Sequence, residues 1–116
     1  MTVPIKCRGK LILYVQNRMF DCLHMAIEKI IEEKNLELSP DMKELIERMN
    51  LGSYGHGGIV YEITDYLKDK EDAFLFAKLV KEAIEIEKDH YKKIKGGMEE
   101  MQNFHTEIIK YVNSLP

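Results

Sequence analysis

The stretch from Leu51 to Leu67, LGSYGHGGIVYEITDYL, interrupts an otherwise helical pattern and holds four of the seven glycines of the chain. Glycine lowers helix stability by roughly 1 kcal/mol per residue relative to alanine, so a helix that enters this stretch is expected to end near Asn50. From Ile59 onward apolar residues return at helical spacing and predict a short helix to Leu67. The stretch therefore predicts a glycine-rich loop between two helices.

Two helices are predicted before this loop. Apolar residues at helical spacing predict one helix over residues 10–34, preceded by an irregular lead-in over residues 1–9. The apolar run Leu11–Val15 is also typical of a short strand, and that alternative stays open. The sequence Ser39–Asp41 predicts the start of the second helix, because serine caps free amides, proline suits the first helical position and aspartate favours the helix dipole.

Two further helices are predicted after the loop. The acidic run Asp69–Asp72 predicts the start of a long helix that continues to Gly96 and Gly97, with Phe74 on its buried side. A last helix is predicted from Met98 to about Leu115. The fold class expected for residues 1–116 is therefore a single all-α domain, a bundle of about five helices with a glycine-rich loop between the second and third.

The distribution of charge indicates the kind of partner. The chain has 116 residues, with 17 basic and 20 acidic side chains, and a net charge of −3. A general nucleic-acid binder usually carries a basic excess, so no nucleic-acid partner is predicted. Residues 28–50 and 59–76 each carry a charge of −3, whereas residues 1–18 carry +4. An acidic middle region suits contact with a basic protein surface.

The cysteines and the apolar runs indicate a cytoplasmic protein. The two cysteines, Cys7 and Cys22, have neither a CxxC spacing nor a zinc-site spacing. They are expected to be reduced thiols, as in the cytoplasm. The run Leu11–Val15 is too short for a signal-peptide core or a membrane span, so no membrane partner is predicted.

The motifs for catalysis and metal binding are weak. The glycine loop lacks the lysine of a Walker motif, and Ser53 does not stand in a Gly-x-Ser-x-Gly motif. The pairs Asp21/His24 and Glu87/His90 each place a carboxylate and an imidazole on one helix face, as in di-iron bundles. Such centres need further inward carboxylates, which the spacing does not supply. We therefore predict no enzyme activity, no metal and no cofactor, and a metal-dependent helical-bundle enzyme is the less favoured alternative.

The run YGHGGIVYEITDYL, residues 54–67, followed by the helix start Lys70-Glu-Asp-Ala-Phe and by Ala83-Ile-Glu, resembles small bacterial immunity proteins. These proteins are encoded beside polymorphic or contact-dependent toxins, and the likeness covers about residues 51–86. Such families carry no catalytic residues. The resemblance implies a cytoplasmic protein that binds and neutralises a cognate toxin domain, a nuclease, by covering its basic surface.

An acidic and aromatic surface would suit this role, because charge complementarity speeds association and aromatic residues anchor interfaces. The candidate partner-binding residues are Tyr54, His56, Tyr61, Glu62, Asp65, Tyr66, Asp69 and Asp72. Spacing does not decide whether Tyr61 or Tyr66 belongs to the core instead. The alternative function is a helical regulator or adaptor that associates with itself, as a homodimer, through methionine-rich faces.

Overall fold

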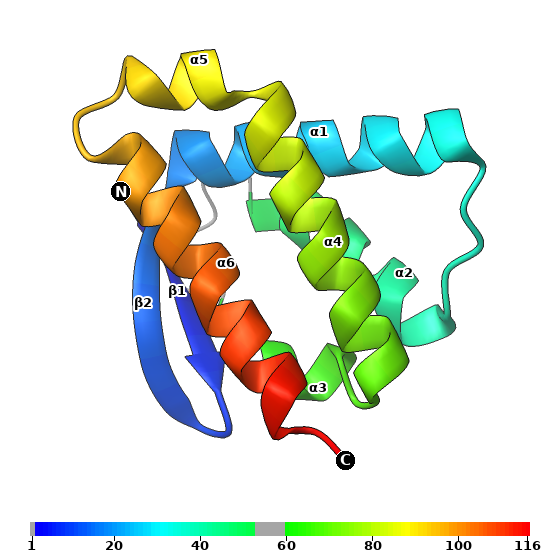
Figure 1. Cartoon of the computed structure of the whole chain (residues 1–116). Helices are drawn as coiled ribbons and strands as arrows, with labels where there is room; N and C mark the ends of the chain where they lie inside the picture. The colour runs from blue at the N-terminus through cyan, green and yellow to red at the C-terminus, as the bar shows by residue number, and fades with distance from the viewer. Residues whose placement is uncertain (1, 53–59) are drawn as a thin grey trace.

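The computed structural model describes residues 2–52 and 60–116, and these residues form three strands and six helices (Figure 1). The prediction of an all-α bundle of five helices is therefore wrong, and the fold is mixed α/β. The elements are β1 (Thr2–Cys7), β2 (Lys10–Gln16), α1 (Asn17–Lys34), α2 (Pro40–Gly52), β3 (Tyr61–Glu62), α3 (Ile63–Tyr66), α4 (Lys70–Ile86), α5 (Lys88–Lys92) and α6 (Gly97–Ser114).

Strands β1 and β2 form an antiparallel hairpin in which Cys7 lies opposite Lys10. The two loop residues, Arg8 and Gly9, have φ values of 52° and 77°. Two positive φ values are typical of a type I′ turn, whose twist matches that of the strands. The strand alternative for Leu11–Val15 is confirmed, and the irregular lead-in is wrong. The helix predicted over residues 10–34 is wrong as far as Gln16 and is confirmed from Asn17 to Lys34, which form α1.

The sheet has the strand order β2–β1–β3, with β3 parallel to β1. The pairing of β1 with β2 contains a bulge next to Ile5. At the end of β2, the backbone N–H of Gln16 donates to Oε1 of Glu100 at 2.6 Å, and the Gln16 side chain donates to Oε2 at 3.1 Å. A carboxylate of α6 therefore holds the outer edge of β2.

The helices cover one face of the sheet and enclose a continuous core. Helix α1 packs against α2 and α4, and α4 packs against α6, which lies beside the hairpin (Figure 1). Val3 and Ile5 of β1 are buried, as alternating residues on one face of a strand should be. At the centre, the ring of Phe20 from α1 lies 5.0 Å from that of Tyr61 and 6.4 Å from that of Phe104, centroid to centroid.

Local capping chemistry predicts two of the helix starts correctly. Helix α2 begins at Pro40, where the Ser39 hydroxyl accepts a hydrogen bond from the backbone N–H of Met42 at 3.2 Å. Helix α4 begins at Lys70 after the Asp69 cap. The predicted long helix up to residue 96 is wrong, because α4 ends at Ile86 and α5 follows as a separate helix.

Some of the other predicted helix boundaries agree with the structure and others do not. The last helix, α6, spans Gly97–Ser114, close to its predicted bounds. Within residues 60–67, the described part of the helix predicted over residues 59–67, Ile63–Tyr66 is helical and Tyr61–Glu62 is a strand. Helix α2 ends at Gly52, slightly beyond the predicted end. The glycine-rich loop predicted to follow α2 lies mostly outside the described residues.

Candidate functional site

The predicted partner-binding residues do not form one surface. Tyr54 and His56 lie outside the described residues. Tyr61 is only 1% exposed, because β3 pairs with β1 and places Tyr61 opposite Ile5. Its hydroxyl donates a hydrogen bond to the backbone carbonyl of Arg48. Tyr61 is therefore a core residue and cannot anchor a partner.

The Glu62 carboxylate accepts hydrogen bonds from other residues of the same chain. Its two oxygens accept hydrogen bonds from the backbone N–H of Gly9 at 2.6 Å, from that of Arg8 at 3.0 Å and from the Thr64 hydroxyl at 2.8 Å. Burial on its own would raise the pKa of the Glu62 carboxyl, but the hydrogen bonds from Gly9, Thr64 and Arg8 together lower it below its ordinary value. Glu62 therefore fastens the hairpin loop to the start of α3.

Replacing Glu62 by glutamine is expected to lower the free energy of unfolding at pH 7 by about 1–3 kcal/mol, because an amide cannot accept all of these bonds. The folded-state pKa is lowered, so the stabilisation is present above the ordinary pKa of 4.5 and is lost as the pH falls through the folded-state pKa. Urea unfolding at pH 7 and pH 3 measures both effects. The difference between wild type and Glu62→Gln should shrink at pH 3.

The matched control for this prediction is Glu33→Gln. Glu33 is an exposed glutamate of α1 that makes no hydrogen bond or ion pair with any described residue. Its substitution should change the unfolding free energy by less than about 0.5 kcal/mol. Equal effects of the two substitutions would show that the Glu62 bonds contribute nothing to stability.

The remaining predicted acids lie around the start of α4. Asp65 on α3 is exposed. Asp69 is exposed and caps α4, since its Oδ1 accepts a hydrogen bond from the backbone N–H of Asp72 at 2.8 Å. The carboxylate of Asp72 is turned toward α2 and accepts a hydrogen bond from the Ser39 hydroxyl at 2.6 Å. Tyr66 is half-buried and packs against the core. Asp65 and Asp69 are thus the predicted acids that most fully face solvent.

Phe74 is the exposed aromatic residue of this region, and the prediction that it is buried is wrong. Its side chain is 52% exposed, and the Lys78 ammonium lies 5.7 Å from the ring centroid. The buried residues Ala73, Ala77 and Val80 follow one another at helical spacing, and Phe74 is one position away from that stripe. A correctly phased stripe would have placed Phe74 in solvent from the sequence.

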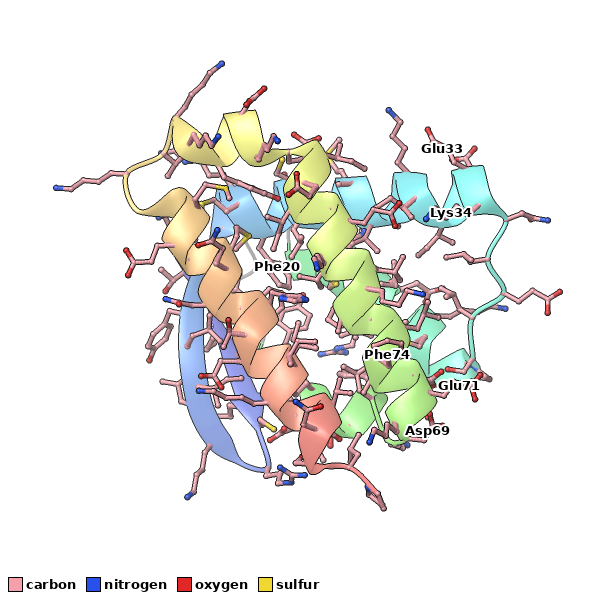
Figure 2. All side chains as sticks on the ribbon, in the orientation of Figure 1. Phe20, Glu33, Lys34, Asp69, Glu71 and Phe74 are labelled. Atoms are coloured by element: carbon pink, nitrogen blue, oxygen red, sulfur yellow. The ribbon has the colours of Figure 1, made fainter. Side chains whose placement is uncertain are left out.

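A hollow beside Phe74 lies between α4 and α6. It has a volume of about 360 Å³ and is lined by Lys70, Glu71, Phe74, Val112 and Asn113. Figure 2 shows Asp69, Glu71 and Phe74 together at the beginning of α4, close to the C-terminal end of α6. An exposed ring, a small hollow and neighbouring carboxylates therefore come together at this end of the molecule.

The two histidine motifs do not meet in a metal centre. His24 is 2% exposed, and its Nε2 lies 3.0 Å from Oε1 of Glu28, whereas His90 is exposed on α5. Over residues 2–52 and 60–116, no three histidine, cysteine, aspartate or glutamate side chains are placed to hold a metal ion. Burial, with a contribution from Glu87, raises the pKa of the Cys22 thiol to about 11, so this thiol is protonated at neutral pH and is a poor nucleophile.

Comparisons with protein families, with curated proteins and with solved structures find no match to this chain. In the part of the chain that the structure describes, no helix is both long and apolar enough to cross a membrane.

Proposed function

We propose that the protein acts by stoichiometric binding to a basic protein partner, through the surface formed by Asp65, Asp69, Glu71 and Phe74. We call this the Phe74 surface. The single observation that carries the proposal is the exposed ring of Phe74 beside the hollow and the acidic start of α4. Buried aromatic residues dominate the energy of many interfaces, and surrounding charges steer the partner and set specificity.

The specific function we propose is that of an immunity protein, which neutralises a cognate toxin domain in the cytoplasm of a bacterium. The resemblance of residues 51–86 to such proteins supports this proposal. A nuclease toxin binds a polyanion and needs a basic substrate groove, so an acidic protein surface can cover that groove. Inhibition of this kind requires tight binding and no catalytic group.

The alternative as a self-associating regulator has less support. It depends on methionine-rich faces, yet Met19, Met42, Met49 and Met101 are all buried. Met25, at 64% exposed, is the methionine that most clearly faces solvent among the described residues. These four methionines therefore fill the core, which is a common use of methionine in helical proteins.

The test of the proposed function is a pull-down of the tagged protein, coexpressed with its genomic neighbours, followed by mass spectrometry of the eluate. The expected result is one stoichiometric partner with a basic surface that is toxic when expressed alone. Recovery of the protein only with itself would contradict the proposal and favour the regulator.

Phe74→Ala is expected to weaken binding to that partner by about 2–4 kcal/mol, or roughly 30- to 700-fold, as removal of an aromatic anchor does. The matched control is Ile86→Ala at the opposite end of α4, because Ile86 is also 52% exposed. Isothermal titration calorimetry on both variants measures the difference. An equal affinity for wild type and Phe74→Ala would move the interface away from this surface.

A further inference from the structure

Helices α1 and α2 and the connector between them line a second hollow, which shares no lining residue with the hollow beside Phe74. This groove has a volume of about 330 Å³. Helix α1 contributes Glu28, Ile31 and Glu32, and α2 contributes Lys43, Ile46 and Glu47. Each set is spaced i, i+3, i+4, so each occupies one face of its helix. The groove is therefore formed by two matching helix faces rather than by an irregular gap.

The floor of the groove is apolar. Ile31 and Leu38 are half-buried and pack against the core, and Ile46 is 5% exposed. Leu38 comes from the connector between α1 and α2 and closes the floor between them. The volume is at the small end of the range for ligand pockets, and it suits a few inserted side chains better than a large cofactor.

The rim of the groove is acidic. Three carboxylates, on Glu28, Glu32 and Glu47, and one ammonium, on Lys43, give the rim a net charge of −2. Glu28 interacts with the buried His24 at 3.0 Å. Glu32, Glu47 and Lys43 make no side-chain hydrogen bond or ion pair with another described residue. The carboxylates of Glu32 and Glu47 are thus available to a positively charged ligand.

Like charges one turn apart on a helix repel each other, and Glu28 and Glu32 stand in this relation on α1. A cationic group placed between them and Glu47 would remove that repulsion. A groove between two helices has the shape that receives a third helix, as in recognition of amphipathic helices by hydrophobic grooves.

We propose that the α1–α2 groove binds a basic amphipathic helix of a protein partner. The apolar side chains of that helix pack on Ile31, Leu38 and Ile46, and its lysine or arginine side chains pair with Glu32 and Glu47. The charge of the rim argues for this occupant, because an acidic or neutral helix would leave the carboxylates uncompensated. The inference concerns a different surface from that of the proposed function and does not depend on it.

The test uses a synthetic helical peptide with leucine on one face and arginine on the other, titrated into the full chain labelled at isoleucine and leucine methyl groups. The expected result is saturable shifts of the methyl signals of Ile31, Leu38 and Ile46. Glu32→Lys with Glu47→Lys should weaken binding by about tenfold or more, as reversal of interface charges does. A peptide of the same composition without an apolar face should not shift these signals.

The matched control is Glu33→Lys, next to Glu32 but outside the lining of the groove (Figure 2). The affinity of this variant for the peptide should stay within about twofold of wild type, since Glu33 is exposed, does not line the groove and can act on the peptide only through a solvated charge. If charge reversal unfolds the protein, Glu32→Gln with Glu47→Gln provides the same test.

Three results would overturn the proposal. The methyl signals could fail to shift, or Glu33→Lys could weaken binding as much as a rim substitution, which would indicate attraction to net charge alone. A concentration-dependent dimer that disappears in Glu32→Lys with Glu47→Lys would assign the groove to a second copy of the chain. The first two results leave the toxin pull-down unaffected, so the two proposals can fail separately.

Discussion

Phe20→Ala is expected to lower the free energy of unfolding by about 3–5 kcal/mol, the usual cost of removing a buried ring. Phe20 of α1 is 1% exposed, and its ring packs against the ring of Tyr61 from β3 and that of Phe104 from α6. The substitution removes apolar surface from the core and leaves a cavity whose walls come from three different elements. Small domains are stable by only about 5–15 kcal/mol, so a large part of the stability depends on this ring.

Urea unfolding followed by circular dichroism measures this loss, and Phe74→Ala is its control. The same ring is removed in both variants, but Phe74 is 52% exposed and the control should change the unfolding free energy by only about 0.5 kcal/mol. Similar losses in the two variants would mean that Phe20 is not the centre of the core. A Phe20→Leu variant should recover part of the loss, because it refills most of the volume.

Gly97→Ala is expected to destabilise the protein by about 1–3 kcal/mol, although alanine favours helix formation. Gly97 is the first residue of α6, and a Cβ atom there would collide with the backbone carbonyl of Tyr91. It would also lie 3.1 Å from Sδ of Met19 and 3.2 Å from Cβ of Ile94. The carbonyl belongs to the backbone of α5, so it cannot move aside as a flexible side chain can.

The neighbouring glycine supplies the control for this prediction. Gly96 has a φ of 70°, and a Cβ atom added there would meet no other atom within 4 Å. The positive φ, and not a steric contact, is therefore what favours glycine at this position. Asparagine tolerates this backbone conformation, and Gly96→Asn should cost less than about 1 kcal/mol. Thermal unfolding of both variants measures the difference. A gain in stability for Gly97→Ala, as helix propensity alone predicts, would show that α5 and α6 can separate without cost.

The helices that start with local capping chemistry are the part of the fold that the sequence predicts well. Ser39 and Asp69 act on amides a few residues away, so a short window contains all of the information. The hairpin is not predicted, because the contacts that decide it lie outside such a short window. An apolar run such as Leu11–Val15 fits a helix or a strand, and its pairing with Val3 and Ile5 decides between them. The cue present in the sequence is Gly9 between two apolar segments.

The candidate surface is predicted only in part, because long-range pairing reassigns side chains between core and solvent. Because β3 joins β1, Tyr61 is buried and the Glu62 carboxylate binds the hairpin loop, and no local pattern reveals this contact. The wrong side of α4 predicted for Phe74 reflects an error of one residue. Each residue of a helix is rotated by about 100° from the previous one, so a phase error of one position is enough to exchange core and surface.

The carboxylate of Glu100 has a consequence for the behaviour of the protein at high concentration. An exposed edge strand is a template on which a strand of another molecule can add, and this is a common start of aggregation. On β2 the bulge next to Ile5 distorts the ladder, and Glu100 already occupies the backbone N–H of Gln16. The opposite edge, β3, has only two residues. We therefore expect a strand of another molecule to find no free donor at Gln16 and only a two-residue strand at β3, which limits edge-to-edge pairing at these two places.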